Sequence, residues 1–94
     1  MLTFETLDFP NMMGNLASEL ARVERVLKKH DEQKIKDYLW ISLELSEQIK
    51  IKFPNTETFR LYEYLASFWI ETPDLKSLQA LEKYALDFYL ESLK

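Results

Sequence analysis

The stretch Phe53-Pro54-Asn55-Thr56 divides the chain, because it ends one long amphipathic segment and opens another. Pro54 disfavours helical geometry at the residue before it, and asparagine is among the strongest N-cap residues. We therefore predict that one helix ends at Phe53, that Asn55 caps the next, and that the next helix begins at Thr56.

A second break lies further along, at Thr72-Pro73-Asp74, where we expect Thr72 to cap a helix whose first residue is Pro73. Outward from both breaks, apolar residues recur every three or four positions, which is the period of an amphipathic helix. The four stripes are Met13, Leu16, Leu20, Val23 and Leu27; Ile35, Tyr38, Ser42, Leu45 and Ile49; Leu61, Tyr62, Leu65, Phe68 and Trp69; and Leu78, Leu81, Ala85, Phe88 and Tyr89.

The boundary between the first two stripes has no glycine or proline to mark it. If the first helical register continued, it would place His30 and Lys34 on the buried face, whereas the apolar stripe resumes one residue later, at Ile35. This slip predicts a break at residues 29–32 with Asp31 as the N-cap. One continuous helix through both stripes is the alternative.

Four amphipathic helices joined by short loops predict an all-α fold. We expect a single domain, residues 1–94, folded as a small antiparallel four-helix bundle with up-down-up-down topology. An α-solenoid fragment of two helical hairpins is the alternative. Asp8 or Asn11 is expected to cap the first helix, and a short N-terminal arm precedes it. The expected bounds are 1–9 for the arm and 11–29, 32–53, 56–71 and 73–93 for the helices.

The composition excludes several classes of chemistry. The 94 residues include no cysteine, one histidine and one glycine. Disulfides, thiolate sites, most metal centres and glycine-rich phosphate loops therefore have no residues to build them. We expect no metal site, no cofactor and no catalytic residue.

The charge balance also restricts the partners. The net charge is −4 at pH 7, and the basic residues Arg22, Arg25 and Lys29 are diluted by neighbouring acids, so we do not expect nucleic acid to bind. No apolar run approaches the roughly 20 residues of a membrane span. Residues 1–5 contain no basic leader. We expect no membrane association and a cytoplasmic location.

The segment from Arg25 to His30 has arginine and histidine five positions apart. It resembles the R-x4-H motif of HEPN-domain ribonucleases, which are helical bundles of similar size. The resemblance covers six residues and implies RNA cleavage by Arg25 and His30 across a dimer interface. Residues five apart lie about 140° apart around a helix, so these two converge only if the helix ends between them.

One stripe on the second predicted helix lies opposite its apolar stripe. It consists of Trp40, Glu44, Glu47 and Ile51. Large apolar side chains on an acidic face are unusual for a monomer surface, and tryptophan is enriched in binding hot spots. We predict that this stripe binds another protein, together with Phe4 and Leu7 of the arm. The alternative is that the second helix is buried on both sides, with Trp40 packed under the arm.

Together these observations favour a non-enzymatic helical module for protein–protein interaction, namely a small adaptor, regulator or inhibitor of another protein. An immunity or antitoxin protein is a more specific alternative, by analogy of fold with bacteriocin immunity proteins. The HEPN-like ribonuclease is the enzymatic alternative, and a homodimer is the alternative assembly. We interpret a row of aromatic residues as core, with the lining of a ligand cavity as the alternative. The row is Phe59, Tyr62, Phe68, Trp69, Tyr84, Phe88 and Tyr89.

Overall fold

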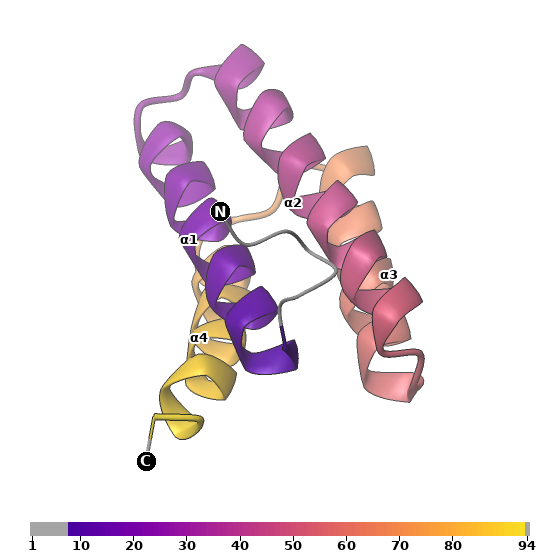
Figure 1. Cartoon of the computed structure of the whole chain (residues 1–94). Helices are drawn as coiled ribbons and strands as arrows, with labels where there is room; N and C mark the ends of the chain where they lie inside the picture. The colour runs from indigo at the N-terminus through magenta and orange to yellow at the C-terminus, as the bar shows by residue number, and fades with distance from the viewer. Residues whose placement is uncertain (1–7, 94) are drawn as a thin grey trace.

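The computed structural model describes residues 8–93, and this part of the chain forms four helices joined by short loops (Figure 1). Each helix buries one apolar face, as the stripes predict. The helices are α1 (Phe9–Lys28), α2 (Glu32–Lys52), α3 (Thr56–Ile70) and α4 (Leu75–Glu91).

The helices form an up-down-up-down bundle with one open side. Helix α1 packs against both α2 and α4, and α2 packs against α3 (Figure 1). Helices α3 and α4 are further apart than these pairs. No Cα atom of α3 lies within 8 Å of a Cα atom of α4. The prediction of an all-α four-helix bundle is confirmed. The solenoid alternative is wrong, because α4 returns to pack against α1.

The turn between α1 and α2 lies where the slip in apolar register predicts it. Helix α1 ends at Lys28, and His30 has a φ of 57°, a left-handed conformation that no helix continues through. The Asp31 carboxylate then accepts a hydrogen bond from the Lys34 backbone N–H at 3.2 Å. The predicted cap is confirmed, and the continuous helix is excluded.

The start of α3 is a capping box, in which two residues satisfy each other's backbone. Asn55 Oδ1 accepts from the Thr58 backbone N–H at 3.0 Å, and Thr58 Oγ1 accepts from the Asn55 backbone N–H at 3.2 Å. The same hydroxyl donates to the Phe53 carbonyl at 2.7 Å. The Asn55 cap is therefore confirmed, and it is joined to the end of α2.

The predicted start of the fourth helix is wrong. Helix α4 begins at Leu75 rather than at Pro73, and its N-cap is Asp74, whose carboxylate accepts from the Ser77 backbone N–H at 2.7 Å. Aspartate is a stronger N-cap than threonine, so the helix begins after Asp74 and not after Thr72. Pro73 is instead buried in the link from α3.

The predicted N-terminal arm, residues 1–9, extends one residue too far, because Phe9 is already part of α1. Asp8 caps α1 by accepting from the Asn11 backbone N–H at 3.0 Å, so Phe9 and Pro10 belong to the helix. The ring of Phe9 packs edge-on against Phe53 at 5.3 Å and Phe88 at 5.2 Å between centroids. The predicted binding residues Phe4 and Leu7 lie outside the described residues.

Between the helices lies a core of mostly aliphatic side chains. Two buried hydroxyls, those of Ser42 and Ser46, donate to carbonyls of their own helix, so neither is left unpaired in the apolar interior. The largest fully buried apolar residues are Met12, Met13, Leu16, Leu20, Leu39, Ile49, Leu65 and Leu78.

Candidate functional site

Helix α2 has two packed sides and one outward side. It contacts α1 and α3, and its exposed residues from Asp37 to Ile51 form the surface that we call the α2 face. Three large apolar side chains lie there: Trp40 is 47% exposed, Ile41 is 41% exposed and Ile51 is 63% exposed. The α2 face comprises Asp37, Trp40, Ile41, Glu44, Glu47, Gln48 and Ile51, and it contains the stripe singled out from the sequence.

The α2 face is acidic and contains no lysine or arginine. Within the described part of the chain, Glu44 and Glu47 form no hydrogen bond and no ion pair, whereas Asp37 accepts from Gln33 at 3.0 Å. Two carboxylates on this face are therefore unpaired next to exposed apolar side chains.

Two of the four lysines of α2, Lys36 and Lys50, are directed toward α3. The Lys36 ammonium lies 4.7 Å from the centroid of Trp69 and donates to the Trp69 carbonyl at 2.5 Å. The Lys50 ammonium lies 3.9 Å from the centroid of Tyr62. These cation–π contacts hold both lysines at the seam between α2 and α3, so they do not neutralise the α2 face.

Trp40 has a packing role as well as an exposed surface. Its ring lies against that of Trp69, with 5.3 Å between centroids and 56° between the ring planes. Trp40 is half exposed. The alternative, packing of Trp40 under the N-terminal arm, involves residues 1–7, which lie outside the described residues. Sequence reasoning missed Trp69 as the partner of Trp40, although Trp69 stands at the edge of the third apolar stripe.

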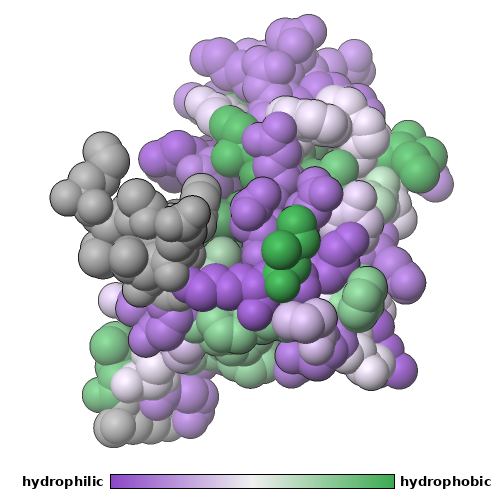
Figure 2. Space-filling view, turned by 45° about the vertical axis from the view of Figure 1, so that its right-hand side comes forward, coloured by the Kyte–Doolittle hydropathy of each residue, from purple (hydrophilic) through white to green (hydrophobic). Residues whose placement is uncertain are grey.

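Figure 2 turns the side of the molecule that carries α2 and α3 forward. Hydrophobic side chains stand separately among hydrophilic ones in this view, rather than as one continuous patch (Figure 2). Any partner of this side must therefore satisfy charged groups as well as cover apolar ones.

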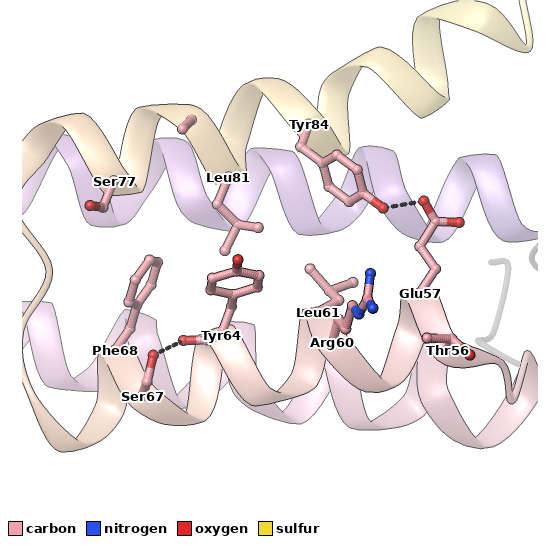
Figure 3. Close-up of a pocket in the computed structure, with 11 residues that line it drawn as sticks. Thr56, Glu57, Arg60, Leu61, Tyr64, Ser67, Phe68, Ser77, Leu81 and Tyr84 are labelled. Atoms are coloured by element: carbon pink, nitrogen blue, oxygen red, sulfur yellow. Dashed lines mark hydrogen bonds between the residues drawn. The ribbon is translucent and has the colours of Figure 1, made fainter.

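A second concave surface lies between α3 and α4, on the open side of the bundle. We call it the α3–α4 groove, and it has a volume of about 900 Å³. Figure 3 shows its lining side chains, which come from these two helices alone. They are Thr56, Glu57, Arg60, Leu61, Tyr64, Ser67, Phe68, Ser77, Ala80, Leu81 and Tyr84.

One hydrogen bond crosses this groove. The Tyr84 hydroxyl donates to the Glu57 carboxylate, which joins α4 to α3 near one end (Figure 3). Burial raises the pKa of the Tyr84 phenol above its ordinary value, and the hydrogen bond and negative charge of Glu57 raise it further.

The predicted aromatic row serves two purposes. Phe68 is buried, and Phe9, Tyr84 and Phe88 form a chain of edge-on ring contacts at 5.2 Å between centroids. Phe68 and Tyr84 also line the α3–α4 groove. The row therefore belongs partly to the core and partly to a cavity wall, and Phe59 is half exposed.

Arg25 and His30, the residues of the R-x4-H motif, lie at the end of α1 and in the turn that follows it. The helix does end between them, as convergence would require. Both are exposed, Arg25 Nε donates to the Ala21 carbonyl at 3.4 Å, and within the described structure no hydrogen bond or ion pair joins the two. The structure does not bring them together into a site.

Neither a metal-binding cluster nor a membrane-spanning helix occurs among the described residues. No cluster of three or more histidine, cysteine, aspartate or glutamate side chains there is arranged to hold a metal ion. No helix formed by those residues has the length and hydrophobicity to cross a membrane.

Comparison with models of protein families, with curated proteins and with solved structures finds no match to this chain.

Proposed function

We propose that this chain is a non-enzymatic interaction module, and that its α2 face binds a basic amphipathic segment of another protein. The observation that carries the proposal is the pair of unpaired carboxylates, Glu44 and Glu47, between the exposed side chains of Trp40 and Ile51. An adaptor, a regulator and an immunity or antitoxin protein are roles that such a module would serve.

Charge supports a basic partner. The chain carries a net charge of −4, and the α2 face contributes acids without a compensating base. Complementary charges at an interface speed association and reject partners of the same sign. A partner with lysine or arginine residues would pair with Glu44 and Glu47, which have no partner within the described structure.

The spacing of the apolar residues supports an elongated partner. Trp40 and Ile51 are separated by three turns of α2, or about 16 Å at the helical rise. A helix lying along α2 would place apolar side chains near both residues and basic side chains between them. An amphipathic helix provides this alternation on one face.

Site-specific photo-crosslinking tests the proposal in the cells that make the protein. We would replace Ile51 with p-benzoylphenylalanine, and in a matched control replace Leu90, which is 46% exposed on α4. We expect a discrete crosslinked species from position 51 alone, and mass spectrometry should place the crosslink in a basic amphipathic segment. Equal yields from both positions, a crosslink to an acidic segment, or a crosslink to a second copy of this chain would refute the proposal.

Charge reversal tests the electrostatic part of the proposal with the partner segment that crosslinking identifies. Glu47→Lys should weaken binding about tenfold, because it places a like charge opposite a basic partner. Glu63→Lys makes the same change of net charge on an exposed residue of α3 and should leave the affinity unchanged. Equal losses in the two variants would mean that only net charge matters.

A further inference from the structure

We propose that the α3–α4 groove binds a small amphiphile, a hydrocarbon chain that ends in a carboxylate. This site is separate from the α2 face, so the two proposals stand or fall independently. It uses different residues, a different side of the bundle and a different class of ligand.

The groove has the size of a small-molecule site. Its volume of about 900 Å³ falls within the range of roughly 300–1,000 Å³ that is typical of ligand pockets. It extends along α3 from Thr56 to Phe68, about 18 Å at the helical rise. A groove of this length suits an extended chain.

The middle of the groove is apolar. Leu61 is 3% exposed, and Phe68 and Leu81 are each 9% exposed, so these side chains form a floor that water barely reaches. Tyr64 stands beside them (Figure 3), and Ala80 lines the groove from α4. Tyr64, which is 58% exposed, and Tyr84, which is 37% exposed, present apolar ring surface to water above this floor, and covering it with a hydrocarbon chain is favourable.

One end of the groove carries two charged side chains of opposite sign, Arg60 and Glu57. Arg60 lines it, is exposed, and forms no hydrogen bond or ion pair within the described structure. The nearby Glu57 already accepts the Tyr84 hydroxyl. Arg60 is therefore the charged group that a ligand must satisfy, and a guanidinium binds a carboxylate through two parallel hydrogen bonds.

The hydrogen bond between Tyr84 and Glu57 limits the width of the ligand. It joins the two helices across the groove beside Arg60 (Figure 3). A helix with its side chains is about 10–12 Å across, so a helical peptide seated at this end would have to displace the hydrogen bond. A single hydrocarbon chain is more slender and can lie along the groove without displacing it, which favours an amphiphile over a helical peptide.

The test is a titration of the full chain with octanoate, followed by two-dimensional NMR. We expect saturable shifts confined to amides of α3 and α4 that surround Leu61, Ala80 and Leu81. Matched probes are 1-octanol, which lacks the charge, and octylammonium, which reverses it; octylammonium should bind at least tenfold more weakly than octanoate. Shifts spread over the whole surface, no saturation, or equal binding of octylammonium would overturn the proposal.

Two variants separate the head from the tail of the ligand. Arg60→Gln should lower the affinity for octanoate about tenfold and leave that for 1-octanol unchanged. Ala80→Trp fills the groove at an exposed position and should abolish the binding of both, while the circular dichroism spectrum stays that of the parent. Octanoate binding that survives both substitutions would place the ligand elsewhere.

Discussion

The indole rings of Trp40 and Trp69 lie with their centroids 5.3 Å apart, and they join the outward side of α2 to the C-terminal end of α3. The Lys36 ammonium covers the Trp69 ring and donates to the Trp69 carbonyl, so a cation, two rings and a helix terminus form one contact. A carbonyl in the last turn of a helix has no partner within the helix, and Lys36 supplies one. Trp40 is thus a packing residue whose outer half remains open to a partner.

Trp40→Ala should lower the free energy of unfolding by about 1–2 kcal/mol. The ring is 47% exposed, so the loss should be smaller than the roughly 3–5 kcal/mol of a fully buried aromatic residue. Thermal and urea melts followed by circular dichroism measure it. Fluorescence of the remaining Trp69 should shift to longer wavelength, because its ring loses its neighbour.

Ile51→Ala is the matched control for that change, because Ile51 is 63% exposed on the same helix. It should change stability by less than about 0.5 kcal/mol, as substitutions on a surface usually do. Ile51 is therefore the better position for testing binding without loss of stability. Equal stability losses in the two variants would mean that the Trp40–Trp69 contact contributes nothing to the fold.

The helices were predictable from the sequence where a local signal marked their ends. Asp31 and Asn55 act as caps through hydrogen bonds to a residue three positions further on, and such a pattern depends only on neighbours in the chain. The start of α4 was not predicted, because Thr72 and Asp74 compete as caps two residues apart. The stronger cap, Asp74, determines where α4 begins.

The candidate sites were predictable only in part, because they depend on distances between helices. The exposed positions of Trp40 and Ile51 followed from the helical period. The approach of Trp69 to Trp40, and of Tyr84 to Glu57, joins residues 29 and 27 positions apart in the sequence. The period of an apolar stripe shows which side of a helix is buried, but it does not show how far that helix lies from the neighbouring helix. The α3–α4 groove therefore could not be predicted.

The carboxyl groups of Glu24 on α1 and Glu82 on α4 face each other. Their contributions to stability should depend on pH in opposite directions. Burial raises the pKa of Glu82, and the negative charge of Glu24 adds to this effect. A hydrogen bond from Gln79 lowers the pKa of Glu24, with a contribution from Lys28. The stabilising contribution of Glu82 is present below its ordinary pKa and is lost as pH rises through its folded pKa. That of Glu24 is present above its ordinary pKa and is lost as pH falls.

Glu82→Gln should therefore stabilise the protein near pH 7 by about 0.5 kcal/mol, the scale of a like-charge pair on a helix surface. The gain should vanish at a pH below the ordinary glutamate value, where the Glu82 carboxyl group is protonated and uncharged. Urea melts across this range measure it. In Glu82→Gln, only the contribution of Glu24 remains, and that contribution is lost as pH falls. The stability of this variant should therefore decrease as pH falls. A gain of equal size at every pH would show that the effect is not electrostatic.

The hydrogen bond from Tyr84 to Glu57 should make stability depend on alkaline pH. The pKa of Tyr84 is raised, so its contribution is fully present below the ordinary tyrosine value of about 10 and is lost as pH rises toward the folded pKa. Tyr84→Phe should cost about 0.5–1 kcal/mol near neutral pH, and the difference from the parent should shrink at alkaline pH. Tyr64→Phe, in the same groove, removes a hydroxyl that forms no hydrogen bond among the described residues, and it should cost less than Tyr84→Phe. A difference between Tyr84→Phe and the parent that is constant with pH would contradict the assignment.

Gly14 lets α1 and α4 approach closely, and its substitution should destabilise the bundle. A Cβ atom at this position would lie 2.9 Å from Cδ2 and 3.0 Å from Cγ of Tyr89. These atoms are at the base of the ring, which can move only if α4 shifts or the χ1 angle of Tyr89 changes. Alanine favours a helix over glycine by about 1 kcal/mol, but the clash should outweigh this gain, as overpacking typically costs about 1–3 kcal/mol. We expect Gly14→Ala to lower the melting temperature of the parent and to raise that of a Tyr89→Ala background, where the ring is absent. A stabilised Gly14→Ala single variant would mean that Tyr89 moves aside freely, and that the close approach of α1 to α4 does not require glycine.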